Sequence, residues 1–151
     1  MKGIAMKPFK TVVLAATMLA AACAGYATRD AGAQAKKVET QRVFEMRTYY
    51  ANPGKMQALH ARFRNHTNKL FEKHGMTLIG FWSPLDAKEA EQKMVYILAY
   101  PSKEAAKKSW KAFRADPDWQ AVVKESEKGG KLLAKPPESV YMNPTDYSPI
   151  K

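Results

Sequence analysis

The sequence is poor in the side chains that support thiol and metal chemistry. Its 151 residues include one cysteine, Cys23, and three histidines. A single cysteine allows no internal disulfide. Two ligands on one helix face need a separation of three or four residues, whereas His60, His66 and His74 are six and eight residues apart. The sequence also has no HExxH pattern and no cysteine pair, so we predict no metal site.

Long apolar runs are equally rare, and the one that stands out lies near the N-terminus. Residues 11–24 are apolar and rich in alanine, and three lysines precede them (Lys2, Lys7 and Lys10). Small residues follow, ending in a cleavage-like Ala33-Gln34-Ala35. The run is shorter than the roughly twenty residues that a membrane-spanning helix needs. We therefore predict a signal peptide over residues 1–35 and a periplasmic or secreted protein.

Cys23 leaves an alternative open for this segment. A lipoprotein signal places a large aliphatic residue three positions before the cysteine that becomes acylated. Here that position is Ala20, and Leu19 lies one step too far back. A membrane-anchored lipoprotein is thus the alternative to a free exported protein. In both cases we expect residues 36–41 to be a flexible linker and residues 42–151 to be the folded domain.

Acidic residues are outnumbered by basic ones. The chain has 25 Lys and Arg against 14 Asp and Glu, a net charge of +11, and 21 against 13 remain without residues 1–35. Such a bias favours an anionic ligand or envelope surface, or it simply keeps a small exported protein soluble. No zinc finger, RNA-reading motif or basic stripe with interleaved aromatics occurs, so we expect no nucleic-acid partner.

The patterns of the remaining chain predict an α+β domain. Strands are expected at residues 43–50, 76–82, 93–100 and 139–142, and helices at 55–74, at 103–115 and from Pro117 to about 129. Ser102 and Asp116 are predicted N-caps, and residues 83–92 allow a short helical turn. The order βαββαβ is that of ferredoxin-like folds, with a four-stranded antiparallel sheet and the helices on one face.

The other sheet face is then left uncovered. Strand 43–50 has an apolar face that begins at Phe44 and a mixed face that begins at Val43. If the more apolar faces meet the helices, the uncovered face carries Glu45, Arg47, Tyr49, Trp82, Tyr96 and Tyr100. An aromatic face of this kind is not expected to stay open to water. We therefore predict a homodimer in which two sheets close face to face about a two-fold axis.

Arg47 is the most informative residue of this predicted face. A guanidinium in a hollow lined by aromatic side chains binds a carboxylate or phosphate through two hydrogen bonds. Tyrosine and tryptophan would form the walls of such a small-molecule pocket. The alternative is that Arg47 pairs with Glu45 or with a carboxylate of a partner chain, while the tyrosines pack the dimer.

Four stretches of the chain resemble the NIPSNAP family: FEMRTYYANPGK (residues 44–55), GFW (80–82), FRADPDWQ (113–120) and PTDYSPIK (144–151). The resemblance covers roughly residues 42–151 in order. It implies the ferredoxin-like half of a dimeric α/β barrel, in a bacterial exported member of the family. The resemblance does not indicate a catalysed reaction. Strands of the family that correspond to residues 93–100 often carry His and Trp, where this chain has Tyr96 and Leu98.

Two hypotheses of function follow. The first is a non-catalytic homodimer that binds a small molecule or an anionic partner. The second is a small cofactor-independent enzyme of monooxygenase or isomerase type, in which Arg47 holds the substrate and Tyr96 or Tyr100 handles the proton. We predict no cofactor. Haem, which related dimeric barrels hold, remains an alternative that would need an axial ligand from a helix edge, because no histidine falls on a predicted strand.

Overall fold

The computed structural model describes residues 41–151. The predicted signal peptide of residues 1–35, with Cys23, and the linker up to residue 40 lie outside the described residues. Within residues 41–151, no helix combines the length and the apolar character that crossing a bilayer requires.

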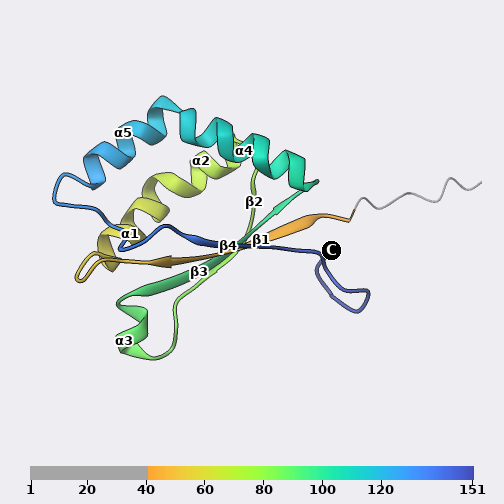
Figure 1. Ribbon diagram of the computed structural model, residues 1–151, viewed down its shortest axis with the longest axis horizontal. Coiled ribbons are helices and arrows are strands. Elements are labelled where there is room, and N and C mark those ends of the chain that lie inside the picture. Colours follow the sequence, from red (N-terminus) through yellow and green to blue (C-terminus); the bar gives the residue numbers. More distant parts are fainter. Residues whose placement is uncertain (1–40) are drawn as a thin grey trace, which may run out of the picture. The chain divides into compact units, whose positions relative to one another are not determined.

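Four antiparallel strands form one sheet. They are β1 (Val43–Tyr50), β2 (Thr77–Trp82), β3 (Lys93–Tyr100) and β4 (Glu138–Met142), and their order in the sheet is β2-β3-β1-β4. Figure 1 shows the long helices stacked on one side of this sheet. The predicted ferredoxin-like α+β fold is therefore confirmed.

The helical turns between β1 and β2, which we call the first helical layer, contain an irregularity that the sequence pattern did not reveal. We expected one helix over residues 55–74, and the structure has α1 (Met56–Arg62), the π-helical turn η1 (Phe63–Thr67) and α2 (Asn68–Lys73). In the π-turn the N–H of Asn68 bonds to the carbonyl of Phe63, five residues earlier. The wider turn changes the direction of every later side chain.

The helices between β3 and β4, which we call the second helical layer, follow the prediction closely. Helix α4 spans Lys103–Ala115 and α5 spans Pro117–Ser126. The short helix α3 (Ala87–Ala90) lies apart from them, in the β2–β3 connection. The Ser102 hydroxyl accepts the N–H of Ala105 at 3.1 Å, so it caps α4 as expected. The Asp116 carboxylate accepts the N–H of Asp118 at 2.8 Å and caps α5. Such caps satisfy the free N–H groups that every helix start exposes.

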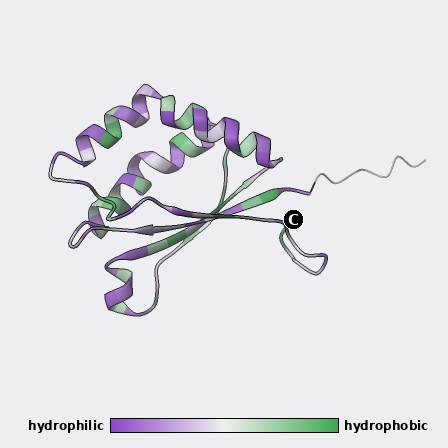
Figure 2. Ribbon diagram, viewed as in Figure 1, coloured by the Kyte–Doolittle hydropathy of each residue, from purple (hydrophilic) through white to green (hydrophobic). Residues whose placement is uncertain are grey.

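An aromatic cluster fills the space between the sheet and the helices. Phe71 of α2 lies at its centre, and its ring contacts those of Phe63, Tyr96, Trp110 and Phe113 at centroid distances of 4.9 to 6.1 Å. Figure 2 shows hydrophilic and hydrophobic bands alternating along the helices, as expected when one side of each helix packs on this core.

The assignment of the sheet faces was wrong for five of the six residues predicted on the uncovered face, and right for Trp82. Paired residues of antiparallel strands share a face, and the pairs Arg47–Tyr96 and Val43–Tyr100 lie on the helix side. Glu45, Tyr49, Tyr96 and Tyr100 are accordingly buried beneath the helices. The face without helices carries the apolar set instead: Phe44, Met46, Val95, Ile97, Val140 and Met142. We call this surface the open sheet face.

Candidate functional site

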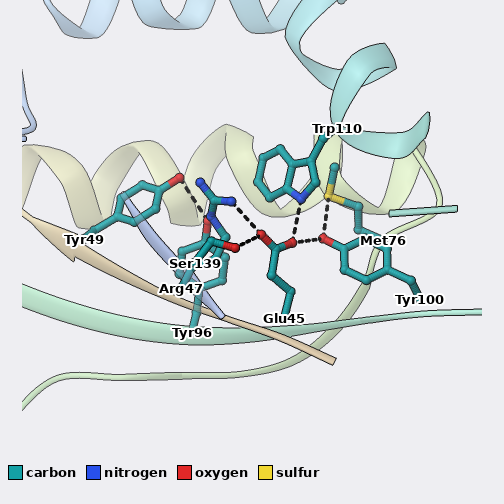
Figure 3. A network of polar contacts seen from close by, with 8 residues as sticks. All are labelled: Glu45, Arg47, Tyr49, Met76, Tyr96, Tyr100, Trp110 and Ser139. Carbon is teal, nitrogen blue, oxygen red and sulfur yellow. Dashed lines mark hydrogen bonds and ion pairs between the residues drawn. The ribbon is translucent and has the colours of Figure 1, made fainter. Parts of the chain in front are cut away.

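Glu45 is the centre of a buried polar network between the sheet and α4. Its side chain is 1% exposed. One carboxylate oxygen accepts hydrogen bonds from Arg47 Nη1 at 2.7 Å and Ser139 Oγ at 2.6 Å. The other accepts the hydroxyl of Tyr100 at 2.7 Å and the indole N–H of Trp110 at 2.6 Å. Figure 3 shows these four donors converging on the one carboxylate. A buried charge needs such complete pairing.

Arg47 lies between this carboxylate and the helical layer. Its guanidinium carbon is 4.2 Å from the centre of the Trp110 ring, a cation–π contact. One of its terminal nitrogens pairs with Glu45, so the contact between the two residues that the sequence suggested is present. The Nε atom is buried and has no hydrogen-bond partner within residues 41–151. The Arg47 guanidinium is thus paired at one nitrogen, unpaired at Nε, and packed against the Trp110 ring.

The pKa values of the network follow from its geometry. Burial raises the pKa of Glu45, but hydrogen bonds from Ser139, Trp110, Tyr100 and Arg47 outweigh this effect and lower it below the ordinary value. Burial and the hydrogen bond to Glu45 raise the pKa of Tyr100. Burial also raises the pKa of Tyr96. Both tyrosines therefore stay protonated at neutral pH and serve as hydrogen-bond donors, which disfavours them as catalytic bases.

The structure brings together five of the six residues predicted to bind a ligand. Tyr96 donates its hydroxyl to the hydroxyl of Tyr49 at 3.0 Å, beside the Glu45 network. Trp82 is separate, because it pairs with Val95 on the open sheet face and is 51% exposed. A Cβ on Gly80 would lie 2.7 Å from the Trp82 ring, so the ring lies over this glycine. Binding of a ligand by these residues stays a prediction.

Two members of the network were not identified as site residues from the sequence. Trp110 lies in the helix predicted at residues 103–115, Ser139 begins the strand predicted at 139–142, and neither had a predicted role in a site. They lie 65 and 94 residues from Glu45 along the chain. A usable signal for Ser139 was present, since a ferredoxin-like sheet places the last strand beside the first, where Ser139 pairs with Arg47.

A second ionic cluster ties the end of α2 to the start of α5. His74 Nε2 lies 2.6 Å from Asp116 Oδ2, and Lys73 Nζ lies 2.9 Å from the same oxygen. Hydrogen bonds from Lys73 and His74 hold the pKa of Asp116 well below its usual range. The predicted role of Asp116 as a cap is confirmed, and the carboxylate also joins the two helical layers.

We expect Asp116→Asn to lower the melting temperature by a few degrees at neutral pH and by less in acid. Asparagine also caps helices, so the variant mainly removes the charge. Since the fold lowers the pKa of Asp116, its contribution is full above the unfolded value of about 3.9 and is lost as the pH falls toward the folded value. Melting curves recorded from about pH 7 to about pH 2 measure the difference in melting temperature between the variant and the unsubstituted protein.

The matched control is Asp118→Asn, because Asp118 also pairs with Lys73 but is exposed. Exposed ion pairs contribute little to stability, so its melting temperature should stay near that of the unsubstituted protein. If the difference in melting temperature between Asp116→Asn and the unsubstituted protein kept its full size in acid, the role assigned to the charge would be contradicted.

Basic side chains are distributed unevenly over the helices. On the first helical layer, Arg62 is buried against Glu127, and Lys73 pairs with Asp116. Their charges are thus neutralised within the fold. Arg64 and Lys69 of the same layer are exposed. Helix α4 has the larger exposed basic set: Lys103, Lys107, Lys108, Lys111 and Arg114. This set makes α4 the helix with the most exposed positive charge among residues 41–151.

The open sheet face has no helical cover within residues 41–151. Val140 is 50% exposed there, and Val95 and Ile97 are partly exposed. Phe44 and Ile97 line a hollow of about 270 Å³, bounded on its other side by the C-terminal segment 142–150. Apolar β-branched residues at the surface of a sheet are typical of a protein interface.

The fold and its buried charged network define a ferredoxin-like α+β domain. A NIPSNAP family model matches residues 44–149, and the chain therefore belongs to the NIPSNAP family. No functionally curated protein matches the chain.

Solved structures of low sequence identity share the fold. Two are NIPSNAP family proteins of Agrobacterium tumefaciens. One, described as having unknown function, has a TM-score of 0.63 at 20% identity, over 75% of this chain and 96% of its own. The other has a TM-score of 0.63 at 22% identity, over 73% and 99%. A putative antibiotic biosynthesis monooxygenase of Nitrosomonas europaea has a TM-score of 0.51 at 14% identity, over 74% and 95%.

Proposed function

We propose that this NIPSNAP protein is an exported homodimer that binds a small molecule or an anionic partner, with the open sheet face as its subunit interface. The observation that supports this proposal most directly is the apolar surface of that face, where Val140 is half exposed. A second copy related by a two-fold axis would cover the same residues on both chains. Helix α4, whose basic residues are exposed, lies on the side of the sheet opposite this interface (Figure 1) and suits an anionic partner.

A non-catalytic role agrees with the Glu45 network. Each oxygen of the carboxylate already accepts two hydrogen bonds from the chain. A general base must offer a free lone pair to the substrate proton, and Glu45 has its acceptor sites occupied. The network is then a positioning element that fixes α4 on the sheet.

Substitution of Val140 by aspartate tests the interface. We expect Val140→Asp to convert the dimer into a monomer, because each interface would bury two unpaired carboxylates. Multi-angle light scattering would show the mass falling from that of two chains to that of one. Circular dichroism checks that the fold is kept.

The matched control is Leu85→Asp, since Leu85 is fully exposed in the β2–β3 connection. This variant should remain dimeric. An unsubstituted protein that is monomeric at micromolar concentration would overturn the proposed homodimer.

One observation favours the enzyme hypothesis, a cofactor-independent monooxygenase- or isomerase-like activity. Arg47 keeps a buried Nε without a partner, and such a nitrogen could bind a substrate anion. The likeness to the putative monooxygenase shows the shared fold alone. Native mass spectrometry of protein from its own source tests whether Arg47 is part of a ligand site. A reproducible adduct that Arg47→Lys abolishes while the dimer persists would identify a ligand, and turnover of that ligand by the unsubstituted protein but not by Arg47→Lys would favour the enzyme.

A further inference from the structure

A cleft separate from the Glu45 network opens between the first helical layer and β2. Its volume is about 290 Å³. This is the lower end of the range for ligand pockets and suits a molecule with one ring. Strand β2 is an edge strand, so no further strand of residues 41–151 covers this side of the cleft.

The inner wall of the cleft is apolar and aromatic. Phe63 of the π-turn and Phe81 of β2 meet edge to face, with ring centroids 5.8 Å apart. Met94 of β3 is buried behind them. Phe63 is buried and holds the partly exposed ring of Phe81, which offers a rigid surface against which a planar apolar group packs.

The outer wall is polar and carries positive charge. His60, Arg64 and Asn68 line it from the helical layer, and Ser83 lines it from the end of β2. No acidic residue is among the lining residues, and Arg64 forms no ion pair within residues 41–151. The guanidinium of Arg64 is therefore available to an anion.

The π-turn brings this polar row into line. Residues four apart on an α-helix drift by about 40° per step, which would turn Asn68 away from His60. The wider turn η1 lies between the two residues and counteracts this drift. Single π-turns inside α-helices occur frequently at functional sites.

Asn68 adds a hydrogen-bonding requirement. Its Oδ1 atom is buried and accepts no hydrogen bond within residues 41–151. Native proteins seldom leave a buried acceptor in this state. A ligand hydroxyl in the cleft would supply the missing donor after a rotation of the amide.

We propose that this cleft binds a small aromatic carboxylic acid that carries a ring hydroxyl. The ring would pack on Phe81, which Phe63 holds in place, the carboxylate would pair with Arg64, and the hydroxyl would bond to Asn68. The proposal rests on the proposed binding function and gives it a site and a ligand class. It needs neither the subunit interface nor the Glu45 network.

Calorimetric titration of the full chain with 4-hydroxybenzoate, benzoate and phenol tests the site. We expect saturable binding of 4-hydroxybenzoate to one site per chain. Phenol should bind about tenfold more weakly, because it lacks the negative charge. Benzoate should bind about fivefold more weakly, because it lacks the hydroxyl donor. Arg64→Glu should weaken 4-hydroxybenzoate at least tenfold. Asn68→Leu should remove the preference for 4-hydroxybenzoate over benzoate.

Arg114→Glu on α4 is the matched control, because Arg114 is exposed and does not line the cleft. Equal losses for Arg64→Glu and Arg114→Glu would mean unspecific charge attraction and would overturn the site. Absence of saturable heat at millimolar ligand would overturn it too. Light scattering on the same samples separates the two proposals: a dimer without binding defeats the cleft alone, and a monomer with binding that depends on Arg64 defeats the homodimer alone.

Discussion

Replacing Glu45 by alanine is expected to lower the free energy of unfolding by about 3–5 kcal/mol. The substitution leaves the partly buried guanidinium of Arg47 without its carboxylate. It also removes the acceptor for Tyr100 and Trp110, whose polar groups are buried. Typical domains have about 5–15 kcal/mol of stability in total. Urea denaturation followed by circular dichroism measures the change.

Two further variants show whether the loss comes from the broken ion pair. Glu72→Ala removes an exposed glutamate of α2 and should change stability by less than about 0.5 kcal/mol. The double variant Glu45→Leu/Arg47→Leu removes both charges, and it should be more stable than Glu45→Ala, because no buried charge is left unpaired. If Glu45→Ala cost less than about 1 kcal/mol, the network would not hold α4 on the sheet.

The order of the elements could be predicted because each one carries its own local signal. The strands β1 and β3 lie at the predicted residues 43–50 and 93–100. Asp116-Pro117 restarts a helix through a cap that involves neighbouring residues alone. Signals of this kind need no knowledge of distant contacts, and the ferredoxin-like fold follows from their order.

Which face of the sheet packs against the helices could not be predicted, since this depends on contacts between distant residues. Counting residue types made Glu45, Tyr96 and Tyr100 appear more suited to an exposed face than Met46 and Ile97. Burial of a polar group is unfavourable only when that group lacks partners, and in the fold Trp110 and Ser139 supply the partners of Glu45. The large rings of the tyrosines also bury much apolar area.

The candidate cleft could not be predicted either. From the sequence, His60 and His66 were considered only as metal ligands, and Arg64 and Asn68 had no predicted role. The cleft instead depends on the π-turn, which puts Arg64 and Asn68 in one row with His60. A 100° helical wheel assumes regular turns, so it cannot reveal such a row.

The π-turn also explains why Phe71 is buried. On a regular helix, Phe71 lies well to one side of the face formed by Met56, Leu59 and Phe63. An extra residue in one turn rotates all later positions back by up to about 100°. Phe71 consequently points into the core and is 1% exposed, while Leu70, which a regular helix would place on the face of Met56, Leu59 and Phe63, is 8% exposed.

Phe71→Ala is therefore expected to lower the free energy of unfolding by about 3–5 kcal/mol. The ring contacts both helical layers and the sheet, through Phe63, Phe113 and Tyr96, so its loss leaves a cavity that no single element can fill by moving. Urea denaturation measures the loss, and hydrogen exchange should show faster exchange in α2 and α4.

Leu70→Ala is the matched control within the same turn. If the π-turn determines which residue enters the core, Phe71→Ala should destabilise the protein more than Leu70→Ala by at least about 1 kcal/mol, because the larger side chain is also the more deeply buried one. A regular helix through residues 63–67 would reverse the order of the two losses. Since the same turn aligns His60, Arg64 and Asn68, a reversed order would also remove the geometric basis of the cleft.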